Sequence, residues 1–464
     1  MRTIILFIGS LLLADFASSQ VLKRLEEAVN NFEKDSQMRN AILGFYVVEQ
    51  KTGAAFFNKN AHVGLAVASS QKVITSTAAL ELLGINYHYK TTLAYDGKME
   101  SGTINGNVYL FGTGDPTLGS WRYANTKEQV VLDGWTKAFV SNKIKRVAGN
   151  LVAYDKNWES QTTPGGWPWN DIGNYYGAGV SALNWRENQY DLKLKSGSKT
   201  GDKASIVSTL PKLYDVSLVS ELTTGKPGSG DNAYIFLPPY GTMGFVRGTI
   251  PPNQSAFTIS GSIPNPPFQL AATLADEFKT KGIEVNAAAP TSQQNLLNKA
   301  ELPKNIATLS THVSPSLDSI NYWFLKRSIN LYGEALIKTL GFEQKASGST
   351  DSGIAVVKSF WKANGVDPFS INIIDGSGLS PQNRVTAAAL VKVMQYARTR
   401  TWFPSFHNAL PEINGIRMKS GTIGGAKSFT GYAGGYTFAI IVNNYDGASG
   451  EIVRKLYKVL DVLK

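Results

Sequence analysis

Ser69-Ser70-Gln71-Lys72 opens a predicted helix that runs to Leu83 and ends at Gly84. Residues three apart share one face of a helix, so the side chains of Ser69 and Lys72 can hydrogen-bond. A lysine whose pKa is lowered by burial can take the proton of a serine without a histidine. The helix N-terminus adds unpaired N–H groups beside the oxyanion that would form. The segment therefore predicts Ser69 as a nucleophile and Lys72 as its base.

The composition excludes several other ways to activate a nucleophile. Cysteine is absent, which excludes thiol catalysis, disulfides and Cys-ligated metals. The four histidines stand singly, and the chain lacks H-E-x-x-H, G-x-S-x-G and G-x-G-x-x-G. A second Ser-x-x-Lys, Ser196–Lys199, lies in a Gly-rich turn that no helix could span. We therefore expect no metal, no cofactor and no histidine-based triad.

The charge of the chain bears on its partners. A formal net charge of +11 predicts either a solvated basic surface or a polyanionic partner, such as a cell wall with acidic polymers. No zinc-finger spacing, basic zipper or aromatic ribonucleoprotein motif accompanies this charge, so we expect no nucleic-acid partner.

The N-terminus is typical of a cleavable export signal. Arg2 supplies the charged start, residues 4–13 form the apolar region, and Ala17-Ser18-Ser19 supplies small residues before Gln20. The apolar run is about half the length that a spanning helix needs. We expect residues 1–19 to be removed and the mature protein to be exported to the periplasm. A basic amphipathic helix predicted near the C-terminus either packs on adjacent strands or lies on a membrane, so any membrane association would be peripheral.

The pattern of predicted elements favours one α/β domain interrupted by an insertion. The first part, residues 20–88, mixes strands and helices. Residues 89–300 are mostly short strands with Gly, Pro and Asn turns, interrupted by helices near 126–141 and 268–281. Helices dominate again in residues 301–464, which end with two strands and a last helix. We therefore expect an α/β multidomain protein.

Two further motifs accompany the Ser-x-x-Lys segment, and each occurs more than once. Ser-Ile-Asn begins at Ser319, Ser328 and Ser370. On a helix the first two would point about half a turn apart, so both cannot face one cleft. Lys-Thr/Ser-Gly has several occurrences, of which only Lys419-Ser420-Gly421-Thr422 follows the Ser-Ile-Asn motifs and leads into the closing strands. There Gly421 would let a substrate backbone lie close to the strand, and Ser420 would offer a hydroxyl to a carboxylate.

Ser-x-x-Lys, Ser-x-Asn and Lys-Thr/Ser-Gly, in this order, form the motif set of the penicillin-recognising serine enzymes. The run Ser328-Ile329-Asn330-Leu331-Tyr332-Gly333-Glu334 closely resembles the S-x-N-L-Y-A-E segment of type-4 penicillin-binding proteins, which selects Ser328 and Asn330. The other landmarks that resemble this family are G-D-P-T-L at 114–118, G-W-P-W-N-D at 166–171, S-A-L at 181–183 and D-G-S-G-L-S at 375–380. The resemblance therefore extends over nearly the whole mature chain.

This resemblance implies a fold. A transpeptidase/β-lactamase-like α/β domain, with helices around an antiparallel sheet, would be split by a large β-rich insertion of two smaller domains. We assign residues 89–187 with 265–300 to one of them and residues 188–264 to the other. Because residues i and i+2 diverge on a regular helix, we expect an irregular turn between Ser328 and Asn330.

The resemblance also implies an activity, that of a serine-type D-alanyl-D-alanine carboxypeptidase and endopeptidase. Ser69 would attack the carbonyl carbon between two terminal D-alanines, with Lys72 as base. Backbone N–H groups of Ser69 and Thr422 would form the oxyanion hole, and Ser328 and Lys419 would relay the proton to the leaving amine. The partners implied are peptidoglycan stem peptides as substrates and β-lactams as covalent inhibitors.

Four residues would hold the substrate. Asn330 would bind the substrate amide and Ser420 the terminal carboxylate. Asp171 and Tyr176 match a W-x-x-D segment followed five residues later by Tyr, which in the family grips the charged end of the third residue of the stem. The structural alternative is that this aromatic segment packs the insertion against the main domain, with Asp171 capping a turn.

Two other functions use the same motifs. A β-lactamase would hydrolyse its acyl-enzyme rapidly, and a wall-binding protein without activity would form none. The sequence leaves open the oligomeric state, the ratio of carboxypeptidase to endopeptidase activity and the group that activates the deacylating water.

Overall fold

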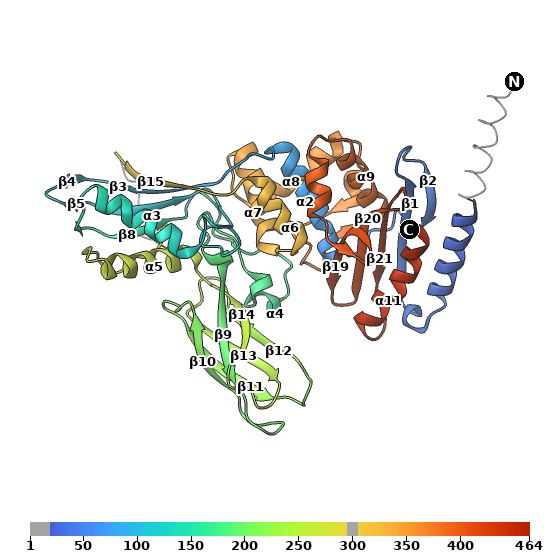
Figure 1. The fold of residues 1–464 in the computed structure, drawn as a ribbon, viewed down its shortest axis with the longest axis horizontal. Helices are drawn as coiled ribbons and strands as arrows, with labels where there is room; N and C mark the ends of the chain where they lie inside the picture. The colour runs from blue at the N-terminus through green and yellow to red at the C-terminus, as the bar shows by residue number, and fades with distance from the viewer. Residues whose placement is uncertain (1–18, 295–304) are drawn as a thin grey trace.

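The computed structural model describes residues 19–294 and 305–464. The predicted signal peptide, residues 1–19, lies outside the described residues apart from its last position. Mixed sheets and helices build an elongated molecule from which one β-rich unit projects (Figure 1). The α/β fold class expected from the sequence is confirmed.

A six-stranded antiparallel sheet forms one end of the molecule. Its strands, in spatial order, are β18 (Glu412–Ile413), β19 (Ile416–Ile423), β20 (Ala426–Ala433), β21 (Tyr436–Asn443), β1 (Ile42–Glu49) and β2 (Ala55–Lys59). The pairing of β1 with β21 over its full length joins the two ends of the chain in one sheet. The first and last parts of the sequence therefore form one domain.

Two terminal helices cover one face of this sheet. A helix that includes residues 19–33 and α11 (Ser449–Leu460) lie side by side over the sheet (Figure 1). Leu25 from the first and Leu456 from the second are fully buried in one cluster with Phe45 and Ile440 of the strands. The apolar face of the basic C-terminal helix is therefore packed on the strands, which was one of the two expected outcomes.

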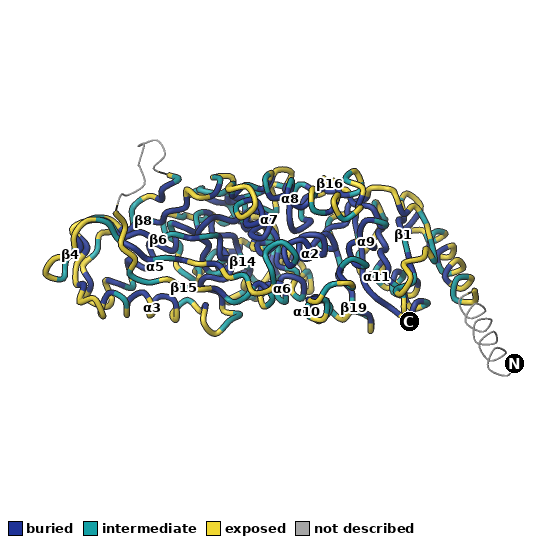
Figure 2. Tube along the Cα trace, turned by 90° about the horizontal axis from the view of Figure 1, so that it is seen from above, coloured by how far each residue is buried: buried dark blue, intermediate teal, exposed yellow. Residues whose placement is uncertain are grey.

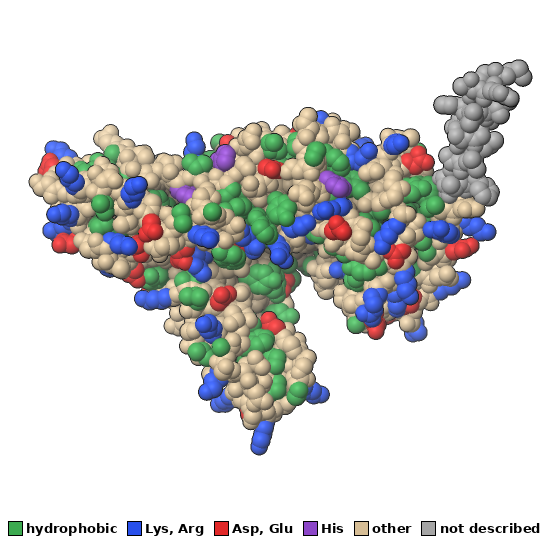
Figure 3. Space-filling view, viewed as in Figure 1, with side chains coloured by type: hydrophobic (Ala, Val, Ile, Leu, Met, Phe, Trp, Pro, Cys, Tyr) green, Lys and Arg blue, Asp and Glu red, His purple; other side chains and the backbone are tan. Residues whose placement is uncertain are grey.

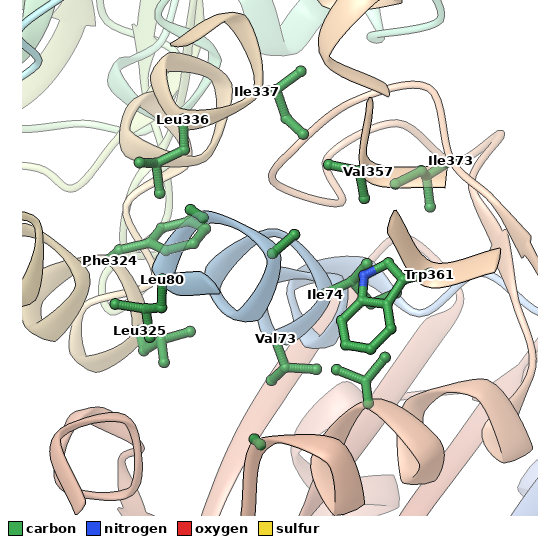
Figure 4. Close-up of a cluster of buried hydrophobic side chains, with 14 of the residues drawn as sticks. Val73, Ile74, Leu80, Phe324, Leu325, Leu336, Ile337, Val357, Trp361 and Ile373 are labelled. Carbon is green, nitrogen blue, oxygen red and sulfur yellow. The ribbon is translucent and has the colours of Figure 1, made fainter. Parts of the chain in front are cut away.

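Helix α2 (Lys72–Leu82) is the centre of the core on the other face. Its residues 72–80 are all buried, and the trace in Figure 2 is dark throughout this region. In Figure 4 the α2 side chains Val73, Ile74 and Leu80 lie among apolar side chains of the surrounding elements, namely Phe324, Leu325, Leu336, Ile337, Val357, Trp361 and Ile373. The surrounding helices are α6 (Leu317–Lys326), α7 (Asn330–Lys345), α8 (Thr350–Ala363), α9 (Ala387–Arg398) and α10 (Phe403–Ala409).

The start of the α2 region differs from the expectation. Ala68–Gln71 form a short 3-10 helix, η2, and the α-helix begins at Lys72. Ser69 therefore lies in the tighter turn and Lys72 at the junction, where i and i+3 side chains still share a face.

The insertion contains a second core around a four-stranded sheet. Its strands, in spatial order, are β15 (Ala307–Val313), β3 (Lys90–Tyr95), β6 (Val108–Gly112) and β8 (Leu151–Tyr154). Helices α3 (Glu128–Ser141) and α5 (Pro266–Thr280) bury Trp135 and Phe278 against it. A small sheet of β4 (Lys98–Glu100), β5 (Thr103–Asn105) and β7 (Arg146–Val147) extends its outer end.

A third core lies in the unit that projects from the body (Figures 1 and 3). Three strands, β10 (Ser205–Leu210), β9 (Gln189–Lys195) and β14 (Phe257–Ser262), form one sheet, and β11 (Ser217–Thr224), β13 (Met243–Ile250) and β12 (Asn232–Phe236) form the other. Leu192 and Val246 from the two sheets are fully buried together, as in a β-sandwich.

The limits of the insertion stay a prediction, with one change. Strand β15 follows residue 300, the expected end of the insertion, yet it pairs with β3 along its length. Backbone hydrogen bonds between these strands tie β15 to the four-stranded sheet, so we propose that the insertion ends at Val313.

Candidate active site

A cleft of about 780 Å³ lies where the helical face, strand β19 and the insertion meet. The predicted site residues that line it are Ser69, Ser328, Asn330, Thr422, Asp171 and Tyr176. They come from segments more than 350 positions apart in sequence, since the first is at 69 and the last at 422. The fold therefore brings parts of all three predicted motifs and of the insertion to one place.

Lys72 makes three polar contacts at the base of this cleft. Its Nζ lies 2.8 Å from Ser69 Oγ, 2.7 Å from Asn330 Oδ1 and 2.7 Å from the carbonyl oxygen of Ser377. The amide and carbonyl oxygens can only accept hydrogen bonds. A neutral Lys72 therefore keeps two N–H bonds to these oxygens and turns its lone pair to the Ser69 hydroxyl. This geometry suits removal of the serine proton.

Burial lowers the pKa of Lys72 to about 7. The side chain is fully buried, which disfavours the charged ammonium, while the carboxylates of Asp375 and Glu334 oppose this effect. A base with this pKa is neutral in a large fraction of molecules at neutral pH.

Ser328 and Asn330 stand at the irregular turn expected from the sequence. Ser328 has a left-handed φ of 56°, and α7 begins at Asn330. Because the turn breaks the helical spacing, both side chains can line one cleft. Asn330 uses both ends of its amide, since Oδ1 accepts from Lys72 and Nδ2 donates to the carbonyl oxygen of Tyr176 at 2.8 Å.

Lys419 is buried beside the cleft and does not line it. Its Nζ donates to the carbonyl oxygen of Ser420 at 2.8 Å. Burial, and then the charges of Lys72 and Lys427, hold the pKa of Lys419 well below its usual range. Thr422 lines the cleft, and Ser420 lies two positions earlier on the same strand face.

Gly421 makes a close contact that the sequence did not predict, and its expected closeness to a substrate backbone stays a prediction. A Cβ at this position would lie 2.2 Å from the carbonyl oxygen of Val67 and 2.9 Å from the backbone nitrogen of Ser69. Strand β19 therefore packs directly on η2. The close approach holds the backbones of Ser69 and Thr422, the two expected oxyanion donors, on adjacent segments.

Asp375 organises the floor of the site and was given no role from the sequence. Its carboxylate accepts hydrogen bonds from Gln71 Nε2 at 3.0 Å, Trp167 Nε1 at 3.0 Å and Asn383 Nδ2 at 2.9 Å. It also accepts from the backbone N–H groups at 378 and 380. These bonds tie the nucleophile segment and the insertion to the loop that carries the carbonyl of Ser377. The only sequence signal was the D-G-S-G-L-S landmark.

Glu334 is a second buried carboxyl that sequence reasoning did not place. Its Oε2 accepts from the backbone N–H of Gly376 at 3.0 Å. Burial, with the neighbouring Asp375, raises the pKa of Glu334 to about 8. The Glu334 carboxyl supports the loop whose Ser377 carbonyl contacts Lys72, and its pKa lies close to that of Lys72.

Asp171 and Tyr176 meet at the insertion side of the cleft. Asp171 lies in α4 (Trp169–Ile172) and Tyr176 in η3 (Tyr175–Gly177), and the Tyr176 hydroxyl donates to Asp171 Oδ1 at 3.3 Å. Burial raises the pKa of Asp171 above its ordinary value. Both side chains line the cleft, so Asp171 is available to a ligand there.

The repeated motifs lie elsewhere. Ser196 donates to the carbonyl oxygen of Pro251 within the sandwich. Asn321 of the first Ser-Ile-Asn accepts from Ser76 in the core, and Ser370 ends the short helix η6 (Pro368–Ser370). None of these lines the cleft.

Residues 19–294 and 305–464 contain no helix with the length and apolar character of a membrane span. They also contain no group of three or more acidic or histidine side chains placed as metal ligands.

Known proteins are similar to this chain in sequence and in fold. The chain is 27% identical over 466 residues to a D-alanyl-D-alanine carboxypeptidase of Actinomadura sp. (strain R39). The alignment covers 94% of this chain and 84% of the relative. The crystal structure of penicillin binding protein 4 from Haemophilus influenzae has the same fold, with a TM-score of 0.78 at 20% identity over 91% of this chain and 96% of that chain. Residues 25–461 match the model of the D-Ala-D-Ala carboxypeptidase 3 (S13) family. The chain belongs to this family.

Proposed function

We propose that the protein is a serine-type D-alanyl-D-alanine carboxypeptidase that acts on peptidoglycan stem peptides through an acyl-enzyme on Ser69. The observation that carries the proposal is the position of Lys72. Its amine contacts the Ser69 hydroxyl while two oxygen acceptors hold its N–H bonds.

Acylation begins with attack of Ser69 Oγ on the carbonyl carbon of the penultimate D-alanine. The serine proton passes to Lys72 Nζ as the new C–O bond forms. Backbone N–H groups of Ser69 and Thr422 stabilise the oxyanion, and the packing of Gly421 on η2 keeps the two segments together.

The C–N bond then breaks, and the leaving amine takes a proton. Ser328 lines the cleft and is the relay to this nitrogen, with the depressed pKa of Lys419 favouring proton movement at neutral pH. Ser420 binds the terminal carboxylate and Asn330 the substrate amide. Water hydrolyses the acyl-enzyme.

The same steps give endopeptidase activity when the leaving amine belongs to a cross-linked stem. Asp171, with Tyr176, selects stems whose third residue ends in an ammonium group, because a half-buried carboxylate that lines the cleft favours such a partner. We propose that the protein acts in the periplasm, where such substrates are found, and the signal-like N-terminus supports this location. β-Lactams acylate Ser69 as substrate analogues.

The test uses purified mature protein and a stem pentapeptide, and mass spectrometry measures the release of D-alanine. Wild type should release one D-alanine per peptide, and Ser69→Ala should release none. Ser196→Ala, which changes the serine of the second Ser-x-x-Lys, is the matched control and should keep full activity. The absence of both D-alanine release and a penicillin adduct would contradict the proposal and favour a binding protein. Rapid turnover of penicillin would contradict it and favour a β-lactamase.

A further inference from the structure

A second hollow, of about 440 Å³, lies beside the active-site cleft and has no part in the proposed chemistry. We call it the side hollow; the lining residues used below are Trp121, Lys127, Glu128, Arg186, Tyr190 and Asp191. Gln189 lines both hollows, and Arg122, next to Trp121, lines the active-site cleft. The two spaces therefore adjoin, so one extended ligand could occupy both.

The side hollow contains buried polar groups that no described residue satisfies. Tyr190 is 1% exposed, and its hydroxyl has no hydrogen-bond partner among the described residues. The Nε of Arg186 is also buried and unpaired. Buried polar groups are almost always hydrogen-bonded in native proteins. Both groups belong to residues that line the side hollow, so a ligand that enters it could complete their hydrogen bonding after a small side-chain movement.

Residues 186–188, which precede the shared Gln189, are held in place by several contacts. Arg186, Glu187 and Asn188 all have left-handed φ values, of 55°, 53° and 52°. The buried Glu187 holds Arg122 at 2.8 Å and accepts from the Tyr332 hydroxyl at 2.8 Å. Arg186 pairs with Glu128. These contacts anchor residues 186–188 on the side of the active-site cleft. The side hollow therefore stays open without a ligand.

The lining favours a neutral, polar ligand with an apolar face. Arg186 is paired with Glu128, and the remaining charges, Lys127 and Asp191, have opposite sign. Trp121 is 48% exposed although it is the largest side chain in the hollow. An exposed indole offers a flat apolar surface for the C–H face of a pyranose ring, and the surrounding polar groups suit its hydroxyl and amide groups.

We propose that the side hollow binds a neutral N-acetylated sugar of the glycan strand that carries the stem peptide. This inference rests on the proposed function, because the sugar would be joined to a stem lying in the active-site cleft. The protein would then distinguish stems attached to glycan from free peptides, and the preference would come from the insertion and not from the catalytic motifs.

The first test compares two substrates, a stem pentapeptide and the same pentapeptide attached to the disaccharide GlcNAc–MurNAc. Wild type should show a higher kcat/KM on the disaccharide substrate, through a lower KM. Tyr190→Phe should reduce this preference by about twofold to tenfold, the range that one hydrogen bond contributes to affinity. Trp121→Ala should reduce it at least as much. Both variants should keep wild-type kcat/KM on the free pentapeptide.

Two controls separate binding from folding. Tyr190→Phe removes a hydroxyl that has no partner in the free protein, so its melting temperature should be unchanged or higher. Phe369→Ala removes a side chain that is 91% exposed and lines neither hollow, and it should leave the preference intact. A lower melting temperature for Tyr190→Phe with an unchanged preference would make the tyrosine structural and overturn the proposal.

A binding experiment tests the site without catalysis. The disaccharide-dipeptide GlcNAc–MurNAc–L-Ala–D-isoglutamine has no D-Ala-D-Ala bond, and calorimetric titration should detect its binding to wild type and weaker binding to Trp121→Ala. Such binding would support the sugar site even if the pentapeptide released no D-alanine. Equal turnover of both substrates by wild type, with no binding of the disaccharide-dipeptide, would overturn the site and leave the proposed function standing.

Discussion

Acidification should slow acylation because Lys72 must be neutral to accept the Ser69 proton. The pKa of Lys72 is about 7, and protonation removes the lone pair that faces the hydroxyl. With this pKa, about nine-tenths of the molecules carry a neutral Lys72 at pH 8 and about a tenth at pH 6. Acylation should therefore slow about tenfold when the pH falls from 8 to 6. Lys72→Arg should be inactive throughout, because guanidinium stays protonated.

The assay is the second-order rate of acylation by a β-lactam without a titrating side chain, measured by stopped flow across this range. Glu334→Gln is the matched control, since the pKa of Glu334 is about 8 and its own titration could produce a similar profile. The rise with pH should persist in this variant. A flat profile in wild type, a rise that disappears with Glu334, or near-normal acylation by Lys72→Arg would refute the role of Lys72.

Three further substitutions test the supporting geometry. Gly421→Ala should slow acylation and lower the free energy of unfolding by about 1–3 kcal/mol, because its Cβ would overlap the carbonyl of Val67; unchanged acylation rates would contradict the close packing. Asp171→Asn should reduce turnover of stems with an ammonium-bearing third residue by about tenfold or more and leave penicillin acylation nearly unchanged, since a charge-assisted hydrogen bond contributes about 1.5–3 kcal/mol; equal losses on both substrates would make the residue structural. Trp167→Phe should lower the free energy of unfolding by about 1.5–3 kcal/mol, measured by chemical denaturation, because it loses its bond to the Asp375 carboxylate; a smaller loss than in a surface control such as Phe369→Ala would argue against that bond.

Local spacing was enough to predict part of the site. Ser69 and Lys72 are three residues apart, and either an α-helix or a 3-10 turn brings their side chains together, so the later start of α2 did not change the prediction. The alternation of strands and helices likewise gave the α/β class. Both inferences depend on residues close in sequence, whose geometry follows from a few backbone angles.

Long-range contacts could not be predicted in the same way. Asp375 collects hydrogen bonds from Gln71 and Trp167, which lie about 300 and 200 positions away, and no periodicity indicates such a meeting. The packing of Gly421 against Val67, in a segment about 350 positions away, was likewise not predicted. The left-handed turn at residues 186–188, which helps to shape the side hollow, contains no glycine, and Asn188 alone was a weak turn signal.

The identity of the nucleophile is the central claim, and mapping a penicillin adduct tests it most directly. Mature protein would be labelled with penicillin, digested and analysed by tandem mass spectrometry, with Ser69→Ala treated in parallel. The adduct should lie on Ser69, and the variant should carry none. An adduct on Ser328 or Ser196, or full labelling of Ser69→Ala, would show that Ser69 is not the nucleophile.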